Sequence, residues 1–179
     1  MGKLTRRGKE EFGSEADRGF RQDARKHYLR KVWSLHEVEM RVLIDTCIFI
    51  HWATDKSLLS KDVIAILEDY DNTICVSSET LRELVIQFNK GKLVSKFWKT
   101  ARQMLESIQN DYFISVLPLK SEHMLTYSDL RINETQDHND PSDHVIIAHA
   151  ITEHLPLVSG DGKFDFYRAQ GLDLIFNEK

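Results

Sequence analysis

Short apolar runs that alternate with helix-like segments are the feature of this sequence that most constrains its fold. The runs are rich in β-branched residues and are apolar throughout, so both faces of each strand would be buried. The strand-like runs lie at 41–45, 73–77, 113–119, 156–161 and 172–176. Strands of this kind, separated by helices, are typical of a parallel sheet covered on both sides. We therefore predict an α/β fold, a three-layer α/β/α sandwich with a parallel sheet of about five strands.

The segments between these runs have helical spacing and helix-capping residues. Ser60 precedes a stretch with apolar residues at helical intervals, and Gly91 provides a stop signal after another. Pro141 stands in the first turn of a third stretch, where proline is tolerated. The sequence predicts helices over 60–70, 78–91, 94–111, 121–130 and 140–154.

The first 39 residues have a different character from the rest. Residues 1–31 contain ten Lys and Arg against five Asp and Glu, a local charge of +5, so the remainder of the −4 chain carries −9. A short helix over 26–40 is compatible with the sequence, and a compact domain is expected to span 40–179. We keep two interpretations of 1–39: an extension without a fixed fold, or a basic arm that touches RNA or a partner.

Composition predicts a globular protein outside membranes. With 179 residues, 41% of them hydrophobic and 29% charged, the chain is large enough to bury a core. No apolar run approaches the roughly 20 residues that span a bilayer, and no apolar segment of a secretory signal follows the first basic residues. Cys47 and Cys75 both lie in apolar segments, which predicts unpaired thiols in a reducing compartment. We therefore expect a cytoplasmic protein.

Four acidic residues occupy informative positions in this pattern. Asp45 and Asp161 each end a predicted strand, and Asp143 lies in the first turn of the helix that Pro141 opens. Glu83 lies in the first or second turn of the helix after the second strand. Because ligands of open α/β sheets bind at the carboxyl ends of the strands, we expect the four acids to converge there.

A cluster of four carboxylates predicts a metal site or a set of raised pKa values. Without cations the charges would repel each other by several kcal/mol. An all-oxygen set favours Mg²⁺ or Mn²⁺ over Zn²⁺. Three of the assignments have rivals nearby in the sequence, which are Glu79 for Glu83, Asp140 for Asp143, and Asp165 for Asp161. A zinc site at His138, His144 and His149 is disfavoured, since 144 and 149 are five residues apart and no cysteine cluster accompanies them.

Four segments, taken together and in order, resemble the PIN domain family and in particular the VapC-like toxins of bacterial toxin–antitoxin pairs. They are LIDTCIFIHW, SSETLRELVIQFNKGKL, HNDPSDHVIIAHA and LVSGDGKF. The resemblance covers about 40–176 and is fairly specific in its order and spacing. It implies that the family's acidic residues correspond to Asp45, Glu83, Asp143 and Asp161. It also implies the family's five-stranded parallel sheet.

The resemblance implies metal-assisted hydrolysis of RNA phosphodiester bonds with one or two Mg²⁺ or Mn²⁺ ions. Asp45 and Asp161 are expected to bind metal directly, and Asp143 directly or through water. Glu83 is expected to bind a second ion or to orient the attacking water. Thr46 and Ser159 would hold a carboxylate or a water in place. Ser142 and His144 flank the third acid where such proteins often have an aromatic residue and an arginine.

The resemblance also implies partners. An antitoxin protein would lay a helix across apolar surface and insert an arginine into the acidic pocket. A homodimer is expected through the helix at 94–111, which is rich in Phe, Trp and Met. Two other functions stay open: a PIN-type nuclease of RNA maturation outside a toxin system, and a non-catalytic PIN module that binds RNA or acts as a scaffold. The presence of all four acids argues against the module.

Overall fold

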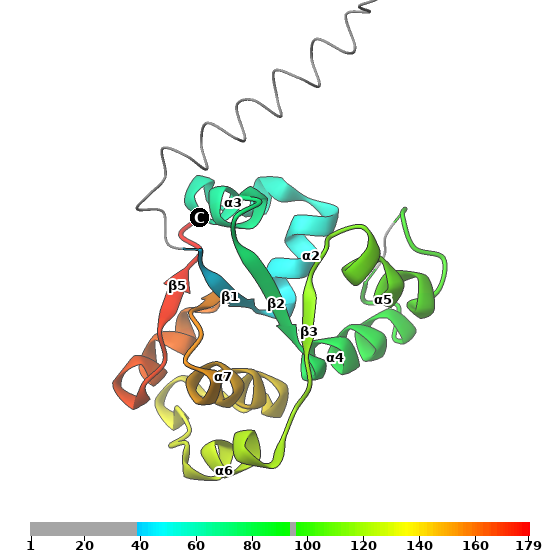
Figure 1. The fold of residues 1–179 in the computed structure, drawn as a ribbon. Helices are drawn as coiled ribbons and strands as arrows, with labels where there is room; N and C mark the ends of the chain where they lie inside the picture. The colour runs from blue at the N-terminus through cyan, green and yellow to red at the C-terminus, as the bar shows by residue number, and fades with distance from the viewer. Residues whose placement is uncertain (1–38, 94–95) are drawn as a thin grey trace, which may run out of the picture. The chain divides into compact units, whose positions relative to one another are not determined.

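A five-stranded parallel sheet forms the centre of the domain. The structure, a computed structural model, describes residues 39–93 and 96–179 (Figure 1). The strands are β1 (Arg41–Ile44), β2 (Thr73–Ser77), β3 (Ser115–Leu117), β4 (Leu157–Ser159) and β5 (Leu174–Phe176). Their order is β3-β2-β1-β4-β5, and every neighbouring pair is parallel. The predicted parallel sheet is therefore confirmed. The predicted extension 1–39, with its helix over 26–40, lies outside the described residues except for 39 and 40.

Helices cover both faces of the sheet. The helices are α2 (Thr46–Thr54), α3 (Lys61–Glu68), α4 (Ser78–Asn89), α5 (Ala101–Asn110), α6 (Ser121–Asp129) and α7 (Pro141–Glu153). Three 3₁₀ segments complete the set: η1 (Lys56–Leu58), η2 (Glu134–Gln136) and η3 (Gly162–Gln170). Buried residues of α2 to α5 pack on one face, and those of α7 and η3 on the other, while α6 packs on α7. Figure 1 shows the same division. This arrangement is the predicted three-layer sandwich.

The two faces of the sheet explain why the strands are apolar throughout. In β1, Val42 and Ile44 belong to the core under α2 to α5, whereas Leu43 belongs to the core under α7 and η3. All three side chains are fully buried. Full burial of an aliphatic side chain stabilises a fold by roughly 1.5–3 kcal/mol, so a central strand contributes to both layers at once.

Local sequence signals set the helix ends. Ser60 Oγ accepts a hydrogen bond from Val63 N at 3.2 Å at the start of α3. Asp140 Oδ1 accepts from Ser142 N at 2.9 Å at the start of α7. Gly91 follows α4 with a φ of +70°, a left-handed conformation that favours glycine. These residues act as the caps and the stop that the sequence predicted.

The helix predicted over 94–111 is wrong in its first half. Helix α5 begins at Ala101, where Thr100 Oγ1 accepts a hydrogen bond from Gln103 N at 3.2 Å, and residues 94 and 95 lie outside the described part. Trp98 precedes the helix and is buried, with its ring stacked on Phe49 at 6.0 Å. The apolar spacing therefore extended across a non-helical segment that also faces the core. Trp98, Met104 and Ile108 of this stripe are buried inside the domain, whereas Phe97 is exposed. The homodimer stays a prediction.

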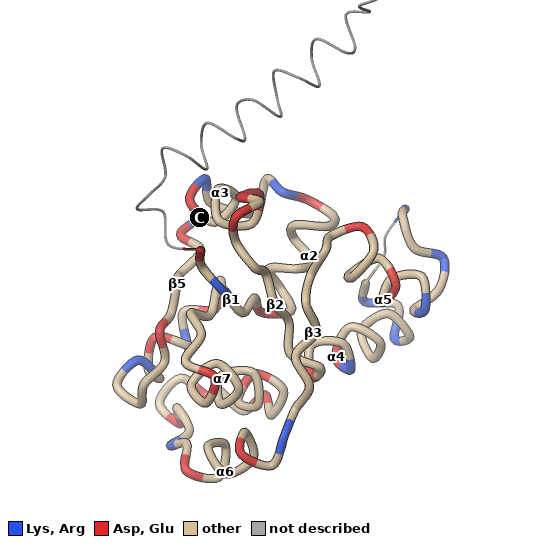
Figure 2. Tube along the Cα trace, in the orientation of Figure 1, with Lys and Arg blue, Asp and Glu red and all other residues tan. Residues whose placement is uncertain are grey.

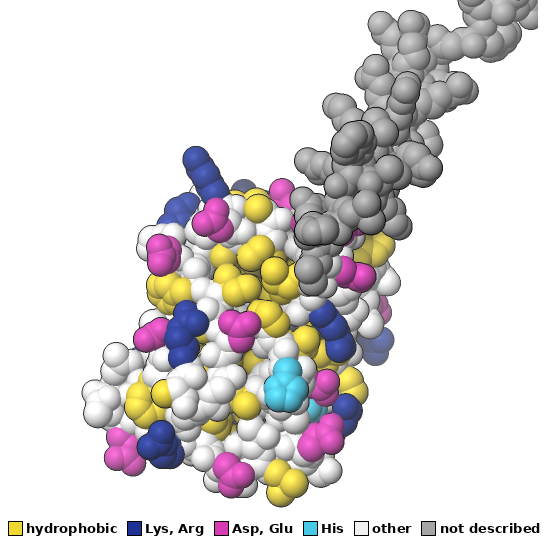
Figure 3. All heavy atoms as spheres, turned by 60° about the vertical axis from the view of Figure 1, so that its left-hand side comes forward, with side chains coloured by type: hydrophobic (Ala, Val, Ile, Leu, Met, Phe, Trp, Pro, Cys, Tyr) yellow, Lys and Arg dark blue, Asp and Glu magenta, His cyan; other side chains and the backbone are white. Residues whose placement is uncertain are grey.

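Charged residues of both signs are interspersed along the described part of the chain (Figure 2). The face turned forward in Figure 3 likewise has hydrophobic side chains between acidic and basic ones. Within the described residues, every helix is too short or too polar to cross a membrane.

Candidate active site

The adjacent central strands β1 and β4 bring two of the predicted acids together. The strands pair in parallel with Ile44 opposite Val158, so both end at the same edge of the sheet. Asp45 follows β1 and caps α2, with Oδ1 accepting from Thr46 N at 2.6 Å. Asp161 follows β4 and caps η3, with Oδ1 accepting from Lys163 N at 2.8 Å. Each carboxylate is thus fixed by the helix that starts after its strand.

Hydroxyl groups connect these acids to each other and to α4. Ser159 Oγ donates to Asp45 Oδ2 at 2.8 Å and accepts from Asp161 N at 3.1 Å. Thr46 Oγ1 donates to Glu83 Oε2 at 2.6 Å. Both hydroxyl-bearing residues are buried. Thr46 and Ser159 therefore contact the acids as expected, and they restrict how the carboxylates can rotate.

Glu83, and not Glu79, faces the other acids. Glu83 accepts hydrogen bonds from Thr46 and from Gln87 Nε2, the latter at 2.7 Å. Glu79 is held by Arg82, whose Nε lies 3.0 Å from both of its carboxylate oxygens. This ion pair lowers the pKa of the Glu79 carboxyl. Arg82 thus pairs with Glu79, whereas the negative charge of Glu83 acts to raise the pKa of Asp45 and of Asp143.

Asp143 is the carboxyl group most affected by the cluster. Burial, followed by the charges of Asp45, Asp140, Glu83 and Asp161, raises its pKa to about 8. Burial also raises the pKa of Asp45, against the hydrogen bonds that it accepts. The four predicted acids therefore influence one another electrostatically, and their negative charges lack a matching cation among the side chains that bond them.

The rivals of Asp143 and Asp161 have other partners. Asp140 caps α7 through Ser142 N. Asp165 has a side chain that is 74% exposed and pairs with Arg168 Nε at 2.8 Å. Neither residue thus takes the position predicted for its neighbour. Whether the four converging acids bind metal stays a prediction.

His138 is a member of this site that the sequence analysis considered only as part of a disfavoured zinc site. Its side chain is 2% exposed, and its Nε2 lies 3.0 Å from Asp143 Oδ2. His138, Asp143 and Asp161 each have one potential metal-ligand atom, and these three atoms all lie within 4.8 Å of one another. Burial, followed by the neighbouring His144, lowers the pKa of His138. The residue precedes α7 in a loop, where neither helical nor strand spacing can indicate which way a side chain points.

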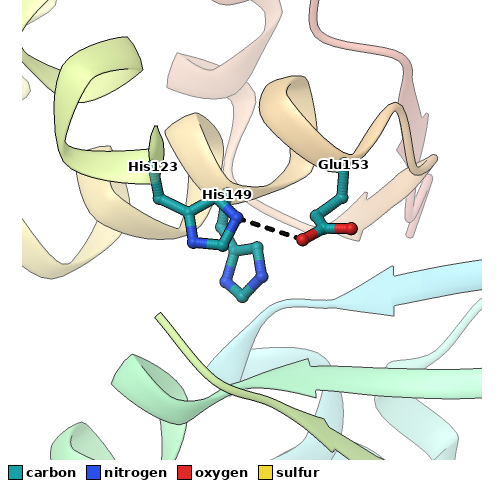
Figure 4. A group of neighbouring side chains, drawn as sticks. All are labelled: His123, His149 and Glu153. Carbon is teal, nitrogen blue, oxygen red and sulfur yellow. Dashed lines mark hydrogen bonds and ion pairs between the residues drawn. The ribbon is translucent and has the colours of Figure 1, made fainter. Parts of the chain in front are cut away.

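A second group of residues of the types that can bind a metal ion lies between α6 and α7. It consists of His123, His149 and Glu153 (Figure 4). His123 Nδ1 accepts from Lys120 N at 3.0 Å, so in the neutral ring the proton is on Nε2, which faces Glu153 Oε1 at 3.2 Å. Lys120 Nζ also contacts Glu153 Oε1 at 3.1 Å. These contacts satisfy His123 and Glu153 without a metal ion, and they join the start of α6 to α7.

His149 completes this second group from the inside. Its ring stacks on His123 with centroids 4.0 Å apart, and its Nδ1 lies 3.0 Å from Ser77 Oγ. Burial, followed by the charge interaction with His123, lowers the pKa of His149 to about 4. The residue is therefore neutral near pH 7 and belongs to the packing of α7 against β2 and α6.

The sequence model of the PIN domain family matches residues 42–171, which is most of the chain. The chain therefore belongs to the PIN domain family, as the sequence segments indicated. A comparison with curated proteins finds no match.

Several solved structures share this fold. A chain in the structure of VapBC2 from Rickettsia felis bound to a DNA fragment from its promoter is 25% identical, with a TM-score of 0.57 over 78% of this chain and 100% of that one. A chain of VapBC-1 from nontypeable Haemophilus influenzae is 20% identical, with a TM-score of 0.55 over 78% and 100%. A chain of DNA-bound VapBC from Salmonella typhimurium is 19% identical, with a TM-score of 0.52 over 76% and 98%. These likenesses agree with a VapC-like PIN domain.

Proposed function

We propose that this protein is a metal-dependent ribonuclease and the toxin of a toxin–antitoxin pair. The observation that carries the proposal is the convergence of Asp45, Glu83, Asp143 and Asp161 from four elements at one edge of the sheet. Hydroxyl groups of Thr46 and Ser159 hold two of these carboxylates. Such a set of buried and half-buried acids is stable in its charged form only if cations lie between them.

The donors suit one or two Mg²⁺ or Mn²⁺ ions. All four proposed ligands are carboxylates, which hard divalent cations prefer. Among the described residues, hydrogen bonds reach one oxygen each of Asp143 and Asp161, Oδ2 and Oδ1 respectively, which leaves the other oxygen for a metal. Bound there, an ion would lower the pKa of a water molecule and offset the charge of the reacting phosphate.

The proposed roles follow from how each acid is held. Asp45 and Asp161 act as direct ligands, since strand ends and helix caps fix them. Asp143 completes the ligand set from α7. Glu83, fixed through Thr46 and Gln87, binds a second ion or orients the water that attacks phosphorus. In the reaction, water adds to phosphorus, the bond to the leaving oxygen breaks, and that oxygen takes a proton.

A basic segment at residues 90–102 supports an RNA substrate. Residues 90–102 contain four lysines and one arginine and no acidic residue, although the chain outside 1–31 carries −9. All five basic side chains are exposed: Lys90, Lys92, Lys96, Lys99 and Arg102. Exposed lysine and arginine side chains bind the phosphates of nucleic acids without regard to sequence.

The toxin assignment rests on the VapC-like segments and on the likeness to chains in VapBC structures. We propose an antitoxin partner that blocks the acidic site and a cytoplasmic location, in line with the two free cysteines. Co-expression with the protein of the neighbouring reading frame tests the partner. Growth inhibition by this chain alone, relieved by that protein, is the expected result.

The nuclease proposal is tested by replacing Asp45 with Asn and measuring RNA cleavage with Mg²⁺, with Mn²⁺ and with EDTA. The change keeps the shape of the side chain and removes its charge. Loss of several kcal/mol of charge stabilisation corresponds to a fall in the cleavage rate of about 100-fold or more. EDTA is expected to abolish the activity of the parent protein.

Asp165→Asn is the matched control, because Asp165 is an exposed acid near the same edge that pairs with Arg168. It is expected to cleave RNA like the parent. Cleavage that survives both Asp45→Asn and EDTA would overturn the proposal. RNA binding by the parent without any cleavage would identify a non-catalytic PIN module instead.

A further inference from the structure

We infer that His138 is a positioning residue for Asp143: it donates a hydrogen bond from Nε2 that orients this carboxylate for a divalent cation, and Tyr167 fixes the tautomer that makes this possible. The inference rests on the proposed function, because it assigns Asp143 as a metal ligand. It adds a residue that lies outside the set of four acids and that comes from the loop between η2 and α7.

The contacts of His138 form a chain through the interior. Asn133 N donates to Tyr167 Oη at 3.3 Å, and Tyr167 Oη lies 3.0 Å from His138 Nδ1. His138 Nε2 then lies 3.0 Å from Asp143 Oδ2. The histidine is 2% exposed and the tyrosine fully buried, so water does not compete for the bond between these two residues. The ring of His138 also contacts Phe164, with centroids 5.5 Å apart, which restricts its rotation.

The positions of the protons follow from satisfying each polar atom. The Tyr167 hydroxyl accepts from Asn133 N and has one proton to donate, and His138 Nδ1 is its partner. A neutral imidazole that accepts at Nδ1 carries its proton on Nε2. That proton points at Asp143 Oδ2, and when a bound cation keeps this carboxylate charged, the hydrogen bond is one of the stronger kinds. Each of these donors is thus matched with an acceptor.

The opposite tautomer would make His138 a metal ligand. Nδ1 would then donate to Tyr167 Oη, the hydroxyl proton would lose its partner among the described residues, and the Nε2 lone pair would face a carboxylate. A buried donor without a partner costs about 1–3 kcal/mol, and two facing lone pairs repel each other. The hydrogen bonds therefore favour the donor role over the ligand role.

The test measures Mn²⁺ and Mg²⁺ binding by calorimetry, together with RNA cleavage as a function of metal concentration. His138→Leu removes the donor and keeps much of the volume. Loss of a residue that hydrogen-bonds a metal ligand typically lowers metal affinity or activity by about 10–100-fold. We therefore expect the dissociation constant for metal to rise by about 10–100-fold in His138→Leu. His138→Gln places an amide N–H near the position of Nε2 and is expected to restore most of the affinity. Tyr167→Phe, which removes only one hydroxyl, is expected to give a smaller loss.

His149→Gln is the matched control, since His149 is an equally buried histidine of α7 with one hydroxyl partner and no contact with the four acids. It is expected to bind metal like the parent. The inference would be overturned if His138→Leu and His138→Gln lost metal affinity equally and the parent preferred Mn²⁺ to Mg²⁺ far more than His138→Gln does. That result would identify His138 as a metal ligand. Unchanged metal affinity in both His138→Leu and Tyr167→Phe would also overturn the inference. Metal binding that depends on Asp143 and His138 in a parent that cleaves no RNA would leave this inference standing and refute the nuclease proposal.

Discussion

Glu79 and Glu83 lie one helical turn apart on α4, yet their carboxylates have different partners. The Glu79 carboxylate accepts from Arg82, which also donates from Nη2 to Ser142 Oγ at 3.0 Å. The Glu83 carboxylate accepts from Thr46, the residue after Asp45. One glutamate therefore joins α4 to α7 through an arginine, while the other adds negative charge to the proposed metal site.

This difference predicts opposite effects for the same substitution. Glu83→Gln is expected to lower RNA cleavage by about 100-fold, as removal of a ligand or of a water-orienting group does, and to leave the unfolding free energy little changed. Glu79→Gln is expected to leave cleavage nearly intact. It should lower the unfolding free energy by about 1–2 kcal/mol, because a hydrogen bond between charged groups is lost. Urea unfolding and initial cleavage rates of both variants provide the measurements.

Either glutamine variant gives a clear contrary result. If Glu79→Gln abolished cleavage while Glu83→Gln retained it, the metal site would include Glu79 and not Glu83. The two variants serve as controls for each other, because both replace Glu with Gln and the two positions lie one turn apart on α4.

Single residues differ in how far the sequence could predict them. Asp45 and Asp161 follow strands, and the carboxyl ends of adjacent parallel strands must meet at one edge, so their proximity follows from topology. Glu83 could not be separated from Glu79 by spacing alone, because the choice depends on the partners Thr46 and Arg82. His138 was considered only for a disfavoured zinc site, because it lies in a loop and its contacts with Asp143 and Tyr167 depend on the three-dimensional fold.

At the scale of elements, the segment that connects α4 to α5 carries the domain's most concentrated positive charge. Its exposed lysines include Lys96 and Lys99, which flank the exposed Phe97 and the buried Trp98. Trp98 stacks on Phe49 of α2, the helix that Asp45 caps. The core contact thus anchors a basic segment to the element that begins at the proposed metal site.

We expect the double variant Lys96→Ala, Lys99→Ala to bind RNA more weakly while binding Mn²⁺ like the parent. Each lost phosphate contact reduces the slope of log affinity against log salt by about 0.7 for single-stranded nucleic acid. The KM for RNA should therefore rise at low salt, and the difference from the parent should shrink as salt is added. Cleavage assays over a range of salt concentrations provide this measurement.

Lys61→Ala with Arg131→Ala is the matched control, because both are exposed basic residues of other elements and the net charge changes equally. It is expected to keep the parent's salt dependence. The same loss in both double variants would mean that net charge, and not the segment between α4 and α5, determines RNA affinity.

The elements themselves show where sequence patterns stop being informative. All five strands were predicted, since a buried parallel strand needs apolar residues on both faces. The start of α5 was not, because Trp98 and Met104 both point into the core and their spacing imitates one helical face. Thr100 is an ordinary N-cap and marks the start of α5. The apolar spacing continues on the N-terminal side of this cap, and so it predicted a longer helix.

At the scale of the whole domain, the sheet separates two polar clusters with opposite electrostatic character. At the carboxyl edge, burial and the neighbouring acids raise the pKa of Asp143 to about 8. Between α6 and α7 the neutral His149 has its pKa lowered to about 4. Stability therefore depends on pH through groups whose effects have opposite signs, and only a comparison of variants separates them.

For His149 the sign can be worked out. The unfolded chain has the ordinary histidine pKa of 6.5, so as the pH falls it takes up a proton before the folded protein does at about 4. The stabilisation by neutral, buried His149 is fully present above pH 6.5 and is lost between 6.5 and 4. Each pH unit in this window removes at most about 1.4 kcal/mol.

His149→Gln keeps a polar side chain at this position but cannot titrate. We therefore expect the difference in unfolding free energy between parent and variant to be constant above pH 6.5 and to shrink by about 1 kcal/mol for each pH unit below it. Urea unfolding at several pH values in EDTA measures this, since Asp143, His138 and His144 titrate in both proteins and cancel. A difference that stays constant down to pH 4 would mean that His149 is already charged in the fold, or that the fold opens around it before it takes up a proton.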